Sequence, residues 1–463
     1  TFLHTDKNNW QPRVGLAYRL RDKWVLRGGY GMYYIGDDQL GSSAGFSRTT
    51  SAVVSTDGLT PVPGMKTANP YVTLGGKLLD PIGSSQGAAS FLGEGVFGWL
   101  RGRGLPYTHQ YSFDIQRELP GGMLFEIGYG GNTTRRLSLG FGLNYIPTNE
   151  LGRRTPTGAI DTAYYTAQVP NPMAGLIPNN AALNGATIQR QILWRAYPQY
   201  SSNSIWSVPI GRNQYHGMSI KVTKRLSHGL SFLSSYGIGK NLQQTRALNA
   251  QDFGGLSNWE NTPLVKESNQ NIDAPQKFVV AGIYELPFGR GRKFAADVPG
   301  IVNQIIGGWQ VNYDVTYQSG WVVDHPNAPQ VRPGSAKLDN PTRTQVFNTS
   351  LWIDPVTKAP LIDPATNRPL VPPNLTYEAR TFPYLFSDAR RPGYQNWDTS
   401  LSKYFPIKEN LRLQFRFEMV NMMNHPWFAD MASTDMTNAA FGQLNPTQRN
   451  LPRFIKLVLH LNW

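Results

Sequence analysis

The sequence contains no cysteine, few charged residues and no apolar run long enough for a membrane-spanning helix. Without cysteine there is neither a disulfide framework nor a thiolate metal site. A transmembrane helix needs roughly 18 consecutive apolar residues, and no stretch approaches that length. Charged residues make up 16%, whereas glycine (46) and proline (34) are plentiful. This composition argues against a helical protein and favours many strands joined by turns and long loops.

The net charge of +14 does not form a pattern that binds nucleic acid. Nucleic-acid-binding proteins carry a basic helix or stripe, and none is present. The basic residues are instead scattered in pairs, at Arg101/Arg103, Arg135/Arg136 and Arg153/Arg154. We therefore expect no nucleic acid as a partner. The positive net charge is better explained by contact with anionic lipid headgroups and by a cationic lumen.

The last eleven residues, Arg453 to Trp463, alternate strictly between apolar and mostly polar positions. Side chains alternate sides along a strand, so one face of this segment is wholly apolar. A soluble sandwich could contain such a strand. Its length, its lysine and histidine on one side and its terminal aromatic are more typical of a transmembrane β-strand, with lipid on one face and a wet lumen on the other.

The same alternation recurs along the chain in hairpin pairs. One helical turn is expected near 301–306, between two of the strands. The predicted strands cover approximately 13–20, 24–35, 107–116, 123–130, 218–225, 231–238, 278–286, 309–317, 396–405, 411–419 and 453–463.

The connections between these strands alternate in length. Short turns are predicted near residues 21, 121, 228, 290–308 and 408, and long irregular loops separate them, including 36–106, 133–214 and 425–452. Outer-membrane barrels have short periplasmic turns and long extracellular loops, whereas a soluble sandwich has no reason to sort its loops this way. Trp24, Trp309 and Trp463 all fall at short-turn ends, as in an interfacial aromatic girdle. The sequence thus predicts an all-β fold, the wall of a transmembrane antiparallel β-barrel in the bacterial outer membrane.

The number of strands, about eleven, predicts that this wall is incomplete. An odd number of strands in up-and-down order cannot close an antiparallel barrel, and an open edge in lipid leaves backbone groups unsatisfied. Eleven is half of the roughly 22 strands of plugged outer-membrane transporters. We expect residues 1–463 to be the C-terminal part of such a barrel. Neither a plug nor a signal peptide is recognisable in them, since Thr1–His4 lack a basic and an apolar region.

Catalytic signatures are missing, so we expect neither an enzyme nor a cofactor. No nucleophile elbow, His-Glu-x-x-His or P-loop spacing occurs. The stretch Gly289–Lys293 is Gly-rich and basic but is predicted to be a periplasmic turn. The seven histidines are dispersed, and Asp37 and Asp38 are more typical of a solvated loop than of a calcium site.

The polar strand faces provide the functional candidates. Charged residues on them should point into the lumen, where they would hold a plug, line a solute path or simply hydrate the inner wall. Charges buried beside a plug need partners. The candidates are Glu126, Asp314, Asp398, Arg412, Arg416 and Glu418.

Several motifs give the chain a resemblance to the C-terminal half of TonB-dependent outer-membrane receptors, most closely the Oar-like group. They are Asn9-Trp10-Gln11-Pro12-Arg13-Val14-Gly15 with Leu26-Arg27-Gly28-Gly29-Tyr30-Gly31, Tyr215-His216 with Lys224-Arg225-Leu226, Tyr284-Glu285-Leu286-Pro287-Phe288-Gly289, Gly307-Gly308-Trp309-Gln310, Tyr317-Gln318-Ser319-Gly320, and Arg416-Phe417-Glu418 with Asn421 and Asn424-His425-Pro426. The resemblance implies a barrel that encloses a plug, contacts TonB through that plug and takes up a ligand.

Two other functions remain open at this stage. The chain could be an outer-membrane structural or adhesive protein whose loops bind partners, or a passive porin. In each case we expect membrane lipid and lipopolysaccharide as neighbours. Nothing in the loops identifies a ligand.

Overall fold

The structure is a computed structural model. It describes residues 6–36, most of 52–100, 104–177, 180–245, 266–268, 273–324, 335–352, 362–363, 368–369, Tyr377, 385–408, 411–433 and 438–462.

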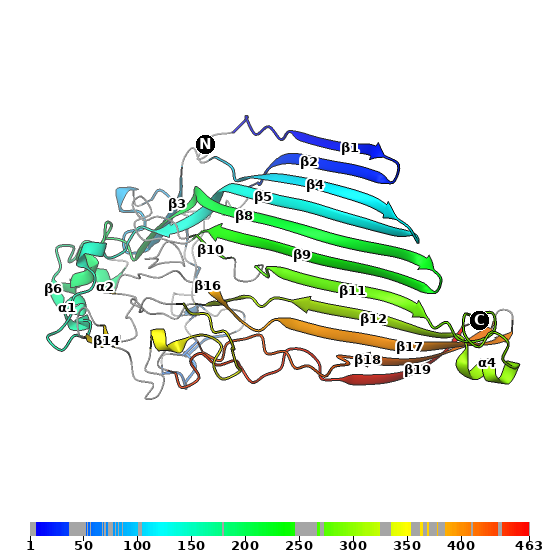
Figure 1. Ribbon diagram of the computed structural model, residues 1–463. Coiled ribbons are helices and arrows are strands. Elements are labelled where there is room, and N and C mark those ends of the chain that lie inside the picture. The colour runs from blue at the N-terminus through cyan, green and yellow to red at the C-terminus, as the bar shows by residue number, and fades with distance from the viewer. Residues whose placement is uncertain are drawn as a thin grey trace.

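One large sheet contains most of the described strands (Figure 1). Its continuous path of eleven strands, called the wall below, is antiparallel throughout and follows the chain order β1-β2-β4-β5-β8-β9-β11-β12-β17-β18-β19. The bounds are β1 (Arg13–Arg21), β2 (Trp24–Tyr34), β4 (Tyr107–Leu119), β5 (Met123–Gly142), β8 (Ser202–Ser227), β9 (Leu230–Gln244), β11 (Gln276–Glu285), β12 (Trp309–Gln318), β17 (Tyr394–Lys408), β18 (Leu411–Val420) and β19 (Phe454–Asn462).

The remaining elements are short. Two further strands join the main sheet, β3 (Gly95–Trp99) parallel to β8 and β10 (Glu267–Ser268) beside β9. Three small two-stranded sheets pair β6 (Gln168–Pro170) with β7 (Thr187–Gln189), β13 (Val322–Asp324) with β16 (Leu385–Arg390), and β14 (Ile362–Asp363) with β15 (Arg368–Pro369). The helices are α1 (Thr162–Thr166), α2 (Ala181–Asn184), α3 (Arg190–Leu193) and α4 (Gly300–Ile306), with 3-10 turns at Gly87–Ala89, Thr148–Glu150 and Thr349–Leu351.

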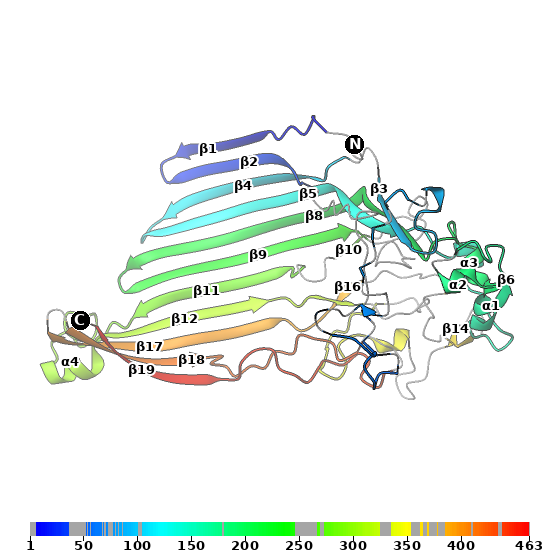
Figure 2. The same cartoon turned by 180° about the vertical axis from the view of Figure 1, so that it is seen from behind.

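The wall confirms the eleven predicted strands and the predicted sorting of their connections. The turn between β1 and β2 and the connection that contains α4 lie at one end of the strands, and the described parts of the long connections lie at the other (Figures 1 and 2). The predicted helical turn is α4. Among the described residues, no helix is both long and apolar enough to cross a membrane.

The structure corrects one prediction, the irregular stretch at 133–214. β5 continues to Gly142 and β8 already begins at Ser202. These two strands therefore extend further toward the long-loop end than the other wall strands. Their pairing shifts register three times between Thr134 and Phe141. Each bulge reverses which face the next side chain takes, so the alternation that marks a strand is lost even though the strand continues.

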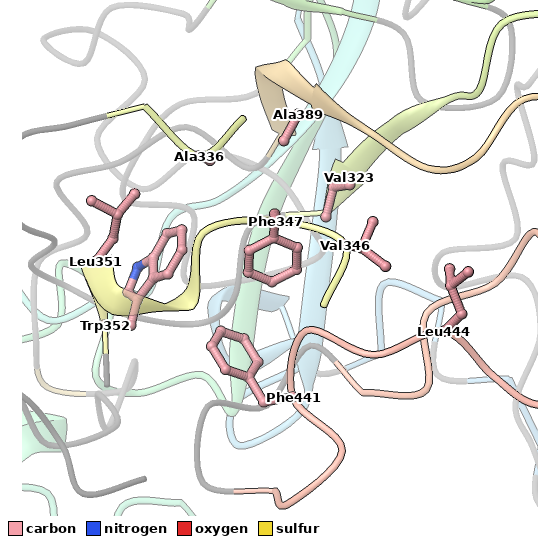
Figure 3. Close-up of a cluster of buried hydrophobic side chains, with 9 residues drawn as sticks. All are labelled: Val323, Ala336, Val346, Phe347, Leu351, Trp352, Ala389, Phe441 and Leu444. Carbon is pink, nitrogen blue, oxygen red and sulfur yellow. The ribbon is translucent and has the colours of Figure 1, made fainter. Parts of the chain in front are cut away.

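The buried apolar residues lie almost entirely outside the wall. The described parts of the long connections, called the outer-loop layer below, hold three apolar clusters of their own. A fourth cluster, built on Phe141 and Val208, lies where β5 and β8 extend past the other wall strands. The largest joins the connection after β12 to the connection after β18 (Figure 3). There the rings of Phe347, Trp352 and Phe441 meet edge to face, with centroids 5.4–6.1 Å apart. A second contact ties in the connection after β5, because Tyr165 stacks on Tyr377 at 4.2 Å.

Candidate functional site

A continuous polar face crosses the whole wall and contains every predicted lumen residue. Directly opposed residues of paired strands share a face, so the register can be followed from strand to strand. Glu126 on β5 opposes Gln116 on β4 and Lys221 on β8. At the other side of the wall, Ser402 opposes Arg416. The opposite face is apolar and includes Val14, Leu16, Leu457 and Leu459, each at least 64% exposed.

Several charges on the polar face have partners within the wall. Glu126 accepts a hydrogen bond from Gln116 Nε2 at 2.7 Å and lies 3.0 Å from Lys221 Nζ. On the last two strands, Glu418 lies between two cations. Its carboxylate is 2.7 Å from Arg416 Nε and 3.8 Å from Lys456 Nζ. These groups keep their charge paired without help from another body.

Asp314 and Asp398 form a second group. They lie directly opposite each other on β12 and β17. Asp398 Oδ1 accepts a hydrogen bond from the backbone N–H of Asn421 at 2.8 Å, which stabilises its carboxylate. Arg412 lies exposed near the short-turn end of β18. The predicted residues therefore share one face but do not converge on one centre, since Glu126 lies six strands away from Arg416 in the sheet.

Sequence reasoning missed a lane across the polar face that bears almost no side chains. Residues at one level of six consecutive wall strands oppose one another directly, and all are glycine or serine. They are Gly15, Gly29, Ser112, Gly130, Gly217 and Gly239. The sequence feature that could have predicted this lane is the presence of glycines at alternating positions, as in Gly29/Gly31, Gly128/Gly130 and Gly237/Gly239. Such a lane lets another body approach the backbone closely.

A hollow of about 730 Å³ lies over this lane, which is within the range of ligand-sized cavities. The ring of Tyr215 lies over Gly217 and Gly239, where a Cβ would collide with it or touch it. Asn241 lines the hollow and is 8% exposed, and its Oδ1 has no hydrogen-bond partner among the described residues. A buried amide oxygen without a partner is costly, so this atom is poised to accept a hydrogen bond.

A buried carboxylate fastens the outer-loop layer to the upper rim of this hollow. Asp273 is 1% exposed and accepts hydrogen bonds from Lys240 Nζ and Arg390 Nη2, both at 2.7 Å, and from the backbone N–H of Asn241 at 2.9 Å. Burial alone would raise the pKa of Asp273. The hydrogen bonds from Asn241, Lys240 and Arg390 outweigh burial and hold that pKa below its ordinary value. The contact joins residues 117 positions apart.

Two of the three predicted girdle tryptophans stand at the short-turn end on the apolar face, each with a cation. The Arg117 guanidinium lies 4.7 Å from the Trp24 ring centroid, and Lys403 Nζ lies 5.0 Å from that of Trp309. A cation over an indole face is favourable, more so when it is shielded from water. Trp463 lies outside the described residues.

A second aromatic row, not predicted from the sequence, lies nearer the long-loop end of the apolar face. It consists of hydrogen-bonded pairs between neighbouring or nearby strands. Tyr317 is eight residues from Trp309 on β12, which at 3.3 Å per residue is about 26 Å. The two rows thus bracket a band of the height expected for the apolar zone of an outer-membrane barrel. The pairs are Tyr30–His109 and Tyr129–His216, both 2.7 Å, and Trp397–Tyr317, 2.8 Å.

The described residues contain no group of three or more His, Asp or Glu side chains arranged to hold a metal ion. His109 and His216 hydrogen-bond to tyrosines on the apolar face instead. Asp37 and Asp38 lie outside the described residues.

An antiparallel wall with one apolar and one polar face, two aromatic rows and loops sorted by length defines an outer-membrane β-barrel protein. The sequence model of the family described as "Outer membrane beta barrel domain" matches residues 1–456, and the chain belongs to this family. The protein is therefore a component of the bacterial outer membrane. The comparison does not resolve the Oar-like group within it. No match was found among curated protein sequences.

The solved structures that are similar to this chain include two transporters and one receptor. The FrpB iron transporter from Neisseria meningitidis is 9% identical with a TM-score of 0.37, over 96% of this chain and 38% of that one. The outer membrane transporter YddB from Escherichia coli is 12% identical, TM-score 0.40, over 94% and 38%. The pyoverdine outer membrane receptor FpvA from Pseudomonas aeruginosa is 10% identical, TM-score 0.38, over 98% and 36%. The chain thus spans less than two fifths of the length of each.

Proposed function

We propose that this chain is the C-terminal half of the barrel of a TonB-dependent receptor, and that the whole protein takes up a ligand through a plugged lumen. The observation that carries the proposal is the open eleven-stranded wall. Among the described strands, β1 pairs only with β2 and β19 only with β18. Because β1 and β19 run in the same direction, they could close the sheet only as a parallel pair. In hydrocarbon, each unpaired backbone group costs several kcal/mol, so further strands have to complete the wall.

The polar face supports a plug rather than an open pore. Glu126 and Glu418 are already paired within the wall, so a body packed against them need not supply partners. The glycine and serine lane leaves room for close packing, and Asn241 offers an acceptor. We propose that Glu126, Asp314, Asp398, Arg412, Arg416 and Glu418 face this lumen, and that TonB acts through the plug.

A passive porin is an alternative function, and conductance measurements distinguish it most clearly from a plugged receptor. The full-length protein, purified from outer membranes and inserted into planar bilayers, should show only background conductance because a plug fills the lumen. Urea, which releases a plug before it unfolds a barrel, should then open large channels. Steady, large channels without urea would contradict the proposal and favour a porin.

A structural or adhesive role is the second candidate, and the outer-loop layer favours it. Apolar clusters and an ion-paired base make this layer a shaped surface suited to partner binding. Both functions predict a closed channel, so conductance does not separate them. Capture of the full-length protein by the purified periplasmic domain of TonB does. Binding supports the receptor, and no binding at high protein concentration favours the adhesin.

A further inference from the structure

The connection between β11 and β12, residues 286–308, is folded and does not belong to the site described above. It lies at the short-turn end of the wall and contains α4 (Figure 1). We propose that this connection, called the foot below, lies in the periplasmic headgroup layer of the membrane and binds anionic phospholipid there. The inference rests on the family and the geometry and does not require transport.

The foot is one folded unit in which the turn is tied to the helix. The Asn303 side-chain oxygen accepts a hydrogen bond from the Arg290 backbone N–H at 2.8 Å. The Arg290 side chain in turn donates from Nε to the Val298 carbonyl at 2.9 Å. Within the turn, Phe294 N–H donates to the Pro287 carbonyl at 2.9 Å. The foot therefore presents a defined surface.

Two side chains of the apolar face hold the end of the helix. Trp309 Nε1 donates to the Ile305 carbonyl at 2.8 Å. Lys403 Nζ donates to the same carbonyl at 3.1 Å and also to the Gly307 carbonyl. Trp309 and Lys403 both alternate in phase with the apolar face, since Val311 and Leu401 oppose each other beside them. The end of α4 is thus fastened on the side of the wall that faces lipid. The turn before it also reaches the polar side, where Arg292 Nη2 lies 3.1 Å from Glu285 Oε2.

The surface of the foot combines apolar and basic groups. Ile301 and Ile305, one helical turn apart, are 80% and 66% exposed. Phe288 and Phe294 are 44% and 48% exposed. The foot has three cations, Arg290, Arg292 and Lys293, and one carboxylate, Asp297. Arg292 is paired with Glu285 at the end of β11, so Arg290 and Lys293 are the cations left to meet an anionic surface.

This combination identifies the occupant as a lipid surface. Amphipathic segments with apolar side chains beside Lys and Arg lie at the headgroup boundary and prefer anionic lipid. The foot continues the lipid-facing surface of the wall at its tryptophan row, so the same bilayer reaches it. A plug, or a second copy of this chain, would have to cover the foot from elsewhere, and the test below includes that outcome.

The absence of cysteine allows an unambiguous label at one position. Ile301→Cys carries an environment-sensitive fluorophore in the full-length protein, reconstituted into nanodiscs of phosphatidylcholine with phosphatidylglycerol. Leu59→Cys, at a loop position 91% exposed, is the water control, and Leu457→Cys, on the lipid-facing side, is the membrane control. We expect iodide to quench the label at 301 at least about threefold less than at 59, as for a group at the boundary. Quenching equal to that at 59 would overturn the proposal.

Brominated lipids then identify what covers the label. In mixed bilayers, brominated phosphatidylglycerol should quench label 301 more than brominated phosphatidylcholine at the same mole fraction. Lys293→Gln should reduce that local enrichment by up to about fivefold, the effect of one cation near an anionic surface, whereas Lys293→Arg should preserve it. Equal quenching by the two lipids would refute the anionic preference. A label shielded from iodide yet quenched by neither lipid would mean that protein covers the foot, and would also overturn the proposal.

Discussion

The wall and the outer-loop layer place their apolar residues in opposite ways. In the wall, large apolar side chains such as Leu457 and Leu459 are 68% and 69% exposed, whereas in the outer-loop layer Phe347 and Trp352 are fully buried. The difference shows which solvent each region is built for. The wall is stabilised by its hydrogen-bonded ladder and by lipid on one face, and the loop layer by packing against itself in water. One chain therefore contains two kinds of core, and substitutions should affect them separately.

The largest expected effect is in the loop layer. Trp352→Ala removes a fully buried indole and should cost about 3–5 kcal/mol of the local stability of that layer. Limited proteolysis of intact proteoliposomes should then cut the connections after β12 and β18 more rapidly. Heat-modifiable gel mobility should still report a folded wall. Loss of the wall together with the layer would show that the two regions do not fold separately.

The next largest effect is expected in the wall. Phe415→Arg places a cation on the lipid-facing side near the middle of β18 and should cost about 2–4 kcal/mol. The adjacent Arg416→Leu, on the polar face, should cost under about 1 kcal/mol because its ion pair with Glu418 is partly exposed. Folding titrations into bilayers measure both. A harmless first variant and a severe second one would mean that the two faces are assigned the wrong way round.

Asp273 connects the wall to the outer-loop layer, and this contact should respond to pH and to mutation. The pKa of Asp273 is lowered in the folded state, so its stabilisation is present above the unfolded value of about 3.9 and is lost as pH falls through the folded value. Asp273→Asn should cost about 3 kcal/mol at pH 7, the low end for a buried ion pair, because Lys240 and Arg390 are partly exposed.

Proteolysis of the loop layer across pH 2–7 checks this contact. The wild type should become sensitive only in acid below about pH 4, and the Asn variant should be sensitive throughout. Asp297→Asn, an exposed carboxylate of the foot, is the matched control and should behave as wild type. If the Asp273 variant kept the wild-type profile, this residue would not fasten the layer.

The smallest effect on stability is expected in the lane. Gly217→Leu displaces the Tyr215 ring, of which Oη, Cζ and Cε1 lie within 3.2 Å of the added Cβ, and should cost about 1 kcal/mol. Its effect on a packed plug should be larger, because the displaced Tyr215 ring and the added side chain project into the hollow over the lane. The full-length variant should therefore leak ions in planar bilayers where wild type does not. Val222→Leu, on the apolar face of the same strand, is the control. A tight seal in both variants would remove the lane from the plug interface.

The amount that could be predicted from the sequence also differed between the two regions. The alternation of Leu411 to Met419 specifies a strand and its two faces because lipid and lumen impose opposite demands on successive residues. Above the membrane that demand disappears. The bulges between Thr134 and Phe141 interrupt the alternation of apolar and polar residues. The sequence pattern therefore predicts a loop where the long-loop ends of β5 and β8 are strands.

Tertiary contacts account for most of what was missed at the candidate site. The polar face followed from alternation, and all six predicted residues lie on it. The lane required the register of six strands, which single-strand patterns do not contain. The Asp273–Arg390 pair joins two distant loops, and only the folded chain brings them together.

The central claim, that this wall is half of a larger barrel, is tested most directly by the backbone hydrogen bonds at its two edges. An experimental structure of the full-length protein in lipid provides them. The account predicts that Val14 to Leu20 pairs on its free edge with a strand outside these 463 residues, and that Ile455 to Leu461 pairs with the first strand of a barrel of about 22 strands. Direct pairing of Val14 to Leu20 with Ile455 to Leu461 in a small closed barrel would contradict it and favour a porin-like protein.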